Sequence, residues 1–71
     1  MGAELWVTPE LLLTVVPLLE CSGYRIVGSR SALGHVVLLV HSPHLSPEVR
    51  RVSLTVQRTQ GGMTAVITPT D

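Results

Sequence analysis

The three histidines of the chain all lie in the segment 35–44. Histidine is the side chain best suited to metal binding and to acid–base chemistry near neutral pH. His35 and His41 flank an unbroken aliphatic run, so on one strand they point to the same face but lie ~20 Å apart at ~3.3 Å per residue. His41 and His44 could supply half of a zinc site, but Glu48 is the only acid near them and structural zinc takes four ligands. We therefore expect no metal and no cofactor.

His35 is the one residue that we retain as a candidate for catalysis, because it follows Gly34 at the start of a strand and would be held by a rigid element. Cys21 falls near the C-terminal end of a predicted helix, where the helix dipole disfavours a thiolate, so we expect a buried structural cysteine. No serine occupies a nucleophile elbow, the glycines do not form a phosphate-binding loop, and the acids are scattered. We expect a protein without enzymatic activity, with a role for His35 left open.

The basic residues are five arginines, and the chain has no lysine. Arg25, Arg30 and Arg51 are the candidates for contacts with nucleic acid. The alternation of side chains in the last predicted hairpin places Arg58 on the core side and Arg51 on the other side, which divides the basic residues between two faces. Aromatic platforms, on which single-strand readers rely, are limited to a single tryptophan and a single tyrosine. We therefore expect that nucleic acid is not the partner.

The size and composition favour association with another protein surface. A chain of 71 residues forms at most one domain, spanning residues 1–71, and at this size folding buries only ~60% of the surface of the unfolded chain. Hydrophobic residues make up 45% and charged residues only 14%, with a mean hydropathy of +0.42, and a single cysteine excludes an internal disulfide. We expect a homo-oligomer, most simply a dimer, or a protein partner that docks through apolar surface or a sheet edge. The interface candidates are Trp6, Val36, Leu38 and Val40.

The apolar composition does not indicate a membrane protein. The longest apolar stretch, 11–19, is interrupted by Thr14 and Pro17 and is shorter than the ~20 residues of a spanning helix. The N-terminal residues lack the basic segment of a secretory signal. One unpaired cysteine fits a reducing compartment, so we expect a cytoplasmic protein.

One helix is predicted near the N-terminus. Thr8 and Pro9 are typical of a helix start, aliphatic residues follow at helical spacing, and Gly23 is a typical C-terminal stop. Pro17 lies inside this span, so we expect a kink or two short helices meeting there. The β-branched residues keep an extended conformation open for residues 10–16.

From Tyr24 onward the apolar residues alternate with a period of two, which predicts strands. A strand in "YRIVGS" is followed by a loop in "SRSALG", an apolar strand over Val36–Val40 and an irregular connection in "HSPHLSPE". The last segment predicts a hairpin with Gly61 and Gly62 as its two-residue turn, an apolar face toward the core and a threonine-rich face toward solvent. The fold class is therefore α+β, with one N-terminal helix packed on a four-stranded antiparallel sheet. A short extra strand from "ELWVT" is a further option.

A helix, then "GYRIV", then a loop that ends in Gly34-His35 resembles the HicA-type small RNA-cleaving toxins, whose fold starts with a helix and three strands and carries a histidine soon after a glycine. The likeness covers residues 10–41. The chain departs from that family in its lack of lysine, in the order of residues before His35, and in the hairpin that stands in place of a second helix. The resemblance implies an alternative function as a small RNA-directed or hydrolytic protein that uses His35 with a nearby arginine.

Overall fold

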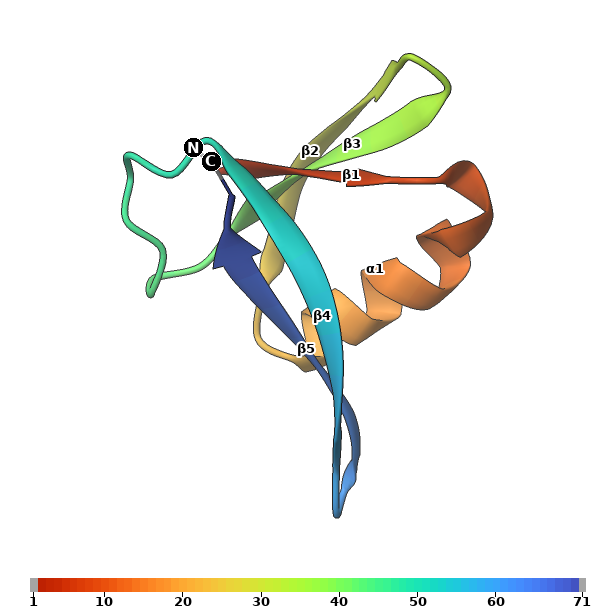
Figure 1. Cartoon of the computed structure of the whole chain (residues 1–71), viewed down its shortest axis with the longest axis vertical. Coiled ribbons are helices and arrows are strands. Elements are labelled where there is room, and N and C mark those ends of the chain that lie inside the picture. The colour runs from red at the N-terminus through yellow and green to blue at the C-terminus, as the bar shows by residue number, and fades with distance from the viewer. Residues whose placement is uncertain (1, 71) are drawn as a thin grey trace.

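The computed structural model describes residues 2–70 and confirms the α+β class with one α-helix. Figure 1 shows the chain beginning with a strand, passing through the helix and ending in four further strands. The elements are β1 (Ala3–Val7), the short 3-10 helix η1 (Pro9–Leu11), α1 (Leu12–Cys21), β2 (Arg25–Ala32), β3 (His35–His41), β4 (Arg51–Thr59) and β5 (Gly62–Pro69).

The sheet has five strands in the order β2-β3-β1-β4-β5, one more than the four predicted, and it is mixed because β1 pairs parallel with β4. The pairings of β2 with β3 and of β4 with β5 are antiparallel, as predicted. β1, which was only an option in the sequence, is the central strand: it pairs antiparallel with β3 and parallel with β4. Ala3, Leu5 and Val7 are buried and alternate with half-buried Glu4 and Trp6, as in a strand with one face in the core. This alternation can be read from the sequence of β1 itself, whereas its pairing partners β3 and β4 lie far away in the chain.

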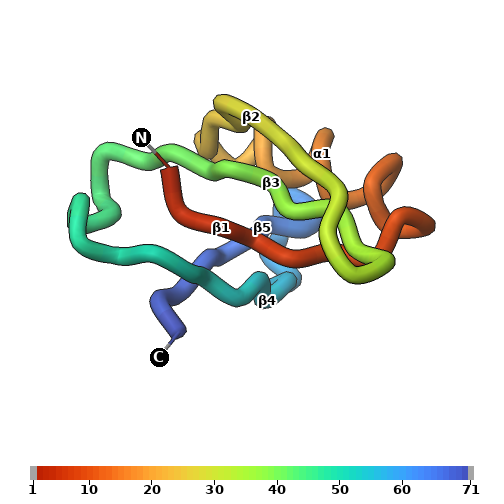
Figure 2. Tube along the Cα trace, turned by 90° about the horizontal axis from the view of Figure 1, so that it is seen from above, coloured from red at the N-terminus to blue at the C-terminus, as the bar shows by residue number. Residues whose placement is uncertain are grey.

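β1 also joins two parts of the sheet that are otherwise separate. It pairs with β3 along its whole length but with β4 only at Glu4–Arg51 and Leu5–Val52, supported by a hydrogen bond from the Glu4 amide to the Arg50 carbonyl oxygen at 2.8 Å. β4 turns away steeply from β1 in Figure 1, and Figure 2 shows β1 lying between β3 and β4. We call this short parallel pairing the β1–β4 seam.

The α-helix begins later than the sequence predicted, at Leu12. The residues before it form the 3-10 turn η1, which is wound more tightly than an α-helix. Thr8 makes no side-chain capping bond. α1 continues through Pro17 to Cys21, so residues 10–16 are not extended and the chain does not divide into two helices at the proline. Pro17 lies on the exposed side of α1, where water can satisfy the carbonyl that loses its amide partner.

The core lies between α1 and one face of the sheet. The helix buries Val15 and Leu19, and the strands contribute alternate residues from β1, β3, β4 and β5. Leu19, Val37 and Val40 are fully buried. The buried cluster on the helix side comprises Ala3, Leu5, Val7, Val15, Leu19, Leu38, Val40, Val52, Ala65 and Ile67. The other face of the sheet has no helix on it, and we call it the open face.

The β2–β3 hairpin is tighter than expected. β2 runs through most of the residues predicted as a loop, and only Leu33 and Gly34 form the turn between Ala32 and His35. Both turn residues have positive φ, at 53° and 79°, as a type I′ hairpin turn requires.

The β4–β5 hairpin has the predicted faces but a different register. Thr59 pairs with Gly62, so Gln60 and Gly61 form the turn rather than the two glycines. This moves the partner of Leu54 from Pro69 to Ile67, a shift of two residues, which leaves every side chain on its predicted face. The apolar face is buried at the base of the hairpin, whereas Val56 and Met63 near the tip are 47% and 58% exposed.

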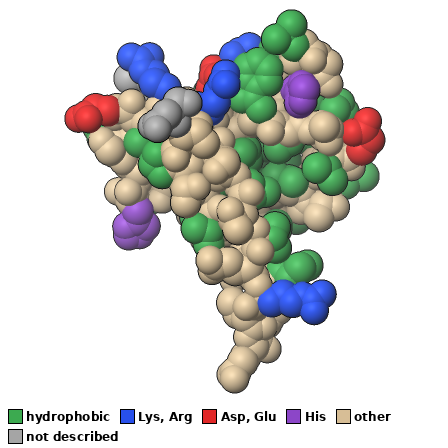
Figure 3. Space-filling model, in the orientation of Figure 1, with side chains coloured by type: hydrophobic (Ala, Val, Ile, Leu, Met, Phe, Trp, Pro, Cys, Tyr) green, Lys and Arg blue, Asp and Glu red, His purple; other side chains and the backbone are tan. Residues whose placement is uncertain are grey.

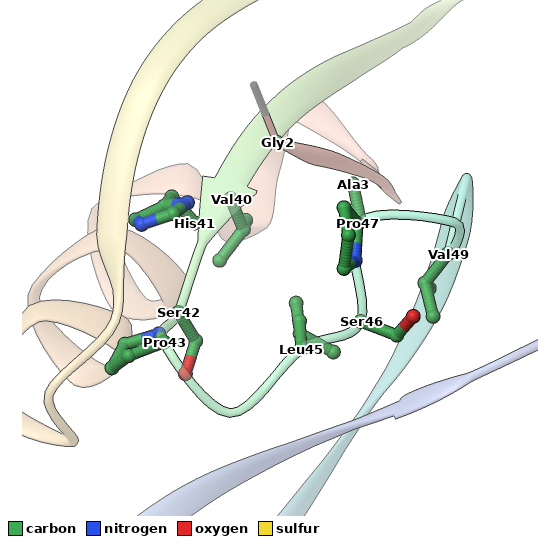
Figure 4. A pocket seen from close by; sticks show the side chains of 10 residues that line it. All are labelled: Gly2, Ala3, Val40, His41, Ser42, Pro43, Leu45, Ser46, Pro47 and Val49. Atoms are coloured by element: carbon green, nitrogen blue, oxygen red, sulfur yellow. The ribbon is translucent and has the colours of Figure 1, made fainter.

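The irregular connection after β3 closes one end of the core. Figure 4 shows Val40 and Leu45 pointing into the cavity beneath this loop, with His41 on the opposite side of the strand. Ser42 is buried, and its hydroxyl accepts a hydrogen bond from the amide of His44 at 3.2 Å. Gly2 lines the same cavity, and a Cβ atom there would lie 2.9 Å from the carbonyl oxygen of Val40, which favours glycine at this close approach.

No helix among residues 2–70 combines the length and the apolar character needed to cross a membrane.

Candidate binding site on the open face

Trp6 lies on the open face and is surrounded by two arginines and a histidine from three strands. The guanidinium carbon of Arg51, from β4, lies 4.9 Å from the centroid of the indole ring, and that of Arg30, from β2, lies 5.9 Å from it. The His35 ring, from β3, is centred 5.9 Å from the indole at an interplanar angle of 57°. Both arginines are within the range of a cation–π interaction. We call these residues together with Glu4 the Trp6 cluster.

The strand register accounts for this convergence. Trp6 pairs with Val37, and Val37 pairs with Arg30, so the three residues form one row across β1, β3 and β2. Arg51 pairs with Glu4, one place along the same face from Trp6. Val37 is fully buried although no helix covers this face, and it lies in the row between the larger residues Trp6 and Arg30.

A β-bulge in β2 places Arg30 in the cluster. Ile26 pairs with Val40 and Gly28 pairs with Leu39, so Val27 is an extra residue that reverses the alternation of all later side chains in β2. Without the bulge, Arg25 and Arg30 would point to opposite faces. With it, both lie on the open face, opposite His41 and Val37.

Glu4 holds the cluster together and is its only acid. Its carboxylate accepts hydrogen bonds from Arg30 Nη2 at 2.8 Å and from Trp6 Nε1 at 3.2 Å. The bond from Arg30, followed by the bond from Trp6, lowers the pKa of Glu4 below its usual value, and the positive charges of Arg30 and Arg51 act in the same direction.

The cluster carries an excess of positive charge. The negative charge of Glu4 balances the positive charge of Arg30 in an ion pair, whereas Arg51 has no ion pair with any residue of the described chain. Arg51 is exposed, and Arg25 lies on the same face toward the other end of β2. All three nucleic-acid candidates from the sequence are therefore on the open face, and two of them contact Trp6. Sequence reasoning missed this grouping because it depends on the bulge, for which the isolated Gly28 within a strand pattern was the available signal.

The ring of His35 packs near Trp6, and among residues 2–70 His35 forms no pair with a second group that could take part in catalysis. Its Nδ1 lies 3.2 Å from the Leu33 carbonyl oxygen, and no carboxylate or nucleophile of the described chain is hydrogen-bonded to it. The arrangement can hold an anion and stack a planar group, but it shows no second group for proton transfer.

The other candidate residues are dispersed. Leu38 and Val40 are buried in the core on the helix side of the sheet, and Val36 is half-buried on the same side. Cys21 is exposed at the end of α1, so the expectation of a buried cysteine is wrong. Among residues 2–70, histidine, cysteine and acidic side chains form no group of three that could hold a metal ion.

A second surface feature lies on the helix side at the β2 edge of the sheet. A shallow groove runs between α1 and strands β2 and β3, and Leu13 beside it is 91% exposed. Its lining is apolar apart from one serine, and we call it the β2 groove: Leu12, Leu13, Val16, Pro17, Ile26, Ser29, Val36 and Leu38.

Comparison of the chain with protein-family models, with curated proteins and with solved structures found no match.

Proposed function

We propose that this protein is a non-catalytic interaction module that forms a symmetric dimer through the outer edge of β2 and the β2 groove. The observation that carries the proposal is the difference between the two edges of the sheet. The β5 edge is closed by the protein's own side chains, whereas the β2 edge is open and lies beside exposed apolar surface.

The β5 edge is closed by the residues that follow α1. The amide of Ala65 donates to Ser22 Oγ at 2.9 Å, and the amide of Ile67 donates to Tyr24 Oη at 3.3 Å. Pro69, the next residue in the same alternation, has no N–H to donate. A strand added here would have to displace these bonds, so this edge is protected against pairing.

In the part of the chain that the structure describes, the β2 edge after its bulge has neither side-chain bonds of this kind nor a proline. Gly28 to Ala32 keep a continuous register with β3 and have no strand on their outer side. The bulge at Val27 limits a new pairing to this segment. The groove beside it adds apolar area, because Leu13, which lines it, is 91% exposed.

A second copy of the chain is the occupant that fits both features. Antiparallel pairing of two β2 strands is two-fold symmetric, with the axis perpendicular to the sheet, so both α1 helices lie on the same side and the two β2 grooves meet at the junction. Pairing of Ser29 with Ser29 places Arg30 opposite Gly28 of the second copy, which keeps the two guanidinium groups apart. The low charge fraction of the chain also favours burial of this surface.

The interface candidates from the sequence lie in three different parts of the structure. Val36 and Leu38 line the β2 groove, Val40 lies in the core, and Trp6 is on the open face. The exposed, unpaired Cys21 supports our proposal of a reducing, cytoplasmic location.

The test is the molecular mass in solution, measured by light scattering across micromolar concentrations, for the protein and for three variants. Leu13→Glu places a charge beside the groove, and Ser29→Lys places a charge on the edge strand. Both sites are exposed, so the folded monomer is retained. Met63→Glu, at the exposed tip of the β4–β5 hairpin, is the matched control.

We expect a dimer for the unmodified protein and for Met63→Glu, and a monomer or an at least tenfold weaker dimer for the two edge variants. A monomer at all concentrations would overturn the proposal. A dimer that is equally stable in Leu13→Glu and Ser29→Lys would show that another surface forms the interface.

A further inference from the structure

We propose that the Trp6 cluster is a binding site for single-stranded nucleic acid, in which Arg51 and Trp6 form a stacking platform for a base and the arginines of the open face contact the phosphates. The site shares strand β2 with the proposed dimer through Arg30, but it does not depend on dimer formation, because pairing through the β2 edge leaves the open face of each copy uncovered.

The first support is the position of Arg51 over the Trp6 ring. The Arg51 guanidinium lies 4.9 Å from the Trp6 ring centroid, and its side chain is exposed. A guanidinium held on an indole presents its outer face for stacking and its N–H groups for an anion. Base stacking on such groups tolerates any base, because every base has a π-face.

The second support is the distribution of charge. Among the strand residues of the described chain, the open face carries Arg25, Arg30 and Arg51 against the carboxylate of Glu4. The acids Glu10 and Glu20 belong to η1 and α1, on the helix side. The neutral chain is therefore positive on the face that holds its tryptophan. In Figure 3, basic side chains, an acidic one and a histidine gather along the upper edge of the molecule, where Figure 1 places β1 and β3.

The third support is the surface around the cluster, which favours a nucleic acid over a protein partner. Apart from Arg51 and Val66, the side chains that β4 and β5 present to the open face are hydroxyl and amide groups: Ser53, Thr55, Gln57, Thr59, Thr64 and Thr68. The centre of a protein interface is more apolar and is depleted of serine, whereas hydroxyl and amide side chains surround the indole ring here. Hydroxyl and amide groups are common donors to phosphate and sugar oxygens.

Trp6 is the chain's single tryptophan, so its fluorescence reports on the site directly. The experiment titrates the full chain with a short oligouridylate, with uridine monophosphate and with polyglutamate, and records the quenching of Trp6. We expect quenching by the oligouridylate, much weaker quenching by the mononucleotide and none by polyglutamate. We also expect the affinity to fall with added salt, with a slope of log K against log[salt] of about −0.7 for each phosphate contacted.

Three single variants separate this site from a general charge effect. Arg51→Gln should weaken binding of the oligouridylate by about tenfold, because it removes both a stacking group and a charge. Glu4→Gln should strengthen binding, because it releases Arg30 from its carboxylate. Arg58→Gln removes the same charge as Arg51→Gln, but from the exposed hairpin tip on the helix side, and should leave the affinity unchanged.

Circular dichroism of each variant checks that the fold is retained. Equal binding of polyglutamate would overturn the proposal in favour of an acidic protein partner. Equal losses in Arg51→Gln and Arg58→Gln would overturn it in favour of non-specific attraction, and an oligouridylate that leaves Trp6 fluorescence unchanged would overturn it outright.

Discussion

Leu33 is the one residue other than glycine, among residues 2–70, with a positive φ. A left-handed backbone costs an L-residue roughly 1–2 kcal/mol, and asparagine tolerates it better. Leu33 is also 89% exposed, so its side chain contributes little packing. The type I′ turn with Gly34 therefore favours Asn at this position.

We accordingly expect Leu33→Asn to stabilise the protein by about 1 kcal/mol, which corresponds to an increase in Tm of about 4–8 °C for a domain of this size. The measurement is thermal unfolding at fixed protein concentration. Leu13→Asn is the control, because Leu13 is equally exposed but helical, where asparagine should give no gain. The same Tm for Leu33→Asn and the unmodified protein would contradict this account of the turn.

The segment that links α1 to β2 closes the β5 edge, and this can be tested at Tyr24. The Tyr24 hydroxyl accepts the amide of Ile67 in a partly buried position. Tyr24→Phe keeps the ring but leaves that amide unpaired, so we expect a loss of about 1–2 kcal/mol in the free energy of unfolding in urea. Ser53→Ala removes an exposed hydroxyl pair with Thr68 and should cost under about 0.5 kcal/mol. Equal losses in the two variants would contradict the protective role of Tyr24.

The elements that the sequence predicted well are those determined by neighbouring residues. The helix and the faces of the β4–β5 hairpin follow from local periodicity, and the faces are correct even though the turn lies one residue earlier than expected, at Gln60 and Gly61. The central position of β1 was not predicted, because pairing with β3 and β4 depends on contacts far apart in the chain. The Trp6 cluster depends on this same central strand and on the extra residue Val27, which places Arg30 on the open face. Its residue types were identified from sequence, whereas their convergence was not.

At the scale of the whole molecule, the β1–β4 seam is a narrow connection between the β2-β3-β1 and β4-β5 parts of the sheet. Only two residue pairs form it, so contacts on both faces must reinforce it. On one face α1 contacts both β2 and β5. On the open face, Trp6 and Glu4 from β1 interact with Arg51 from β4 across the seam. The candidate site and the joint between the two parts of the sheet are therefore the same residues.

Protonation of Glu4 should weaken this joint. Because the folded protein lowers the pKa of Glu4 below its usual value of 4.5, the carboxylate contributes stability that is present above that pH and is lost as the pH falls below it. At pH ~7 we expect Glu4→Gln to lower Tm by roughly 2–4 °C, a modest loss because the pair is solvent-exposed. The deficit should shrink toward zero as the pH falls through the range below 4.5, where both side chains are neutral. Glu48→Gln, which removes no ion pair from the described chain, should leave Tm unchanged at pH ~7. A deficit for Glu4→Gln that persists undiminished in acid would show that shape or packing, rather than the charge of Glu4, supports the seam.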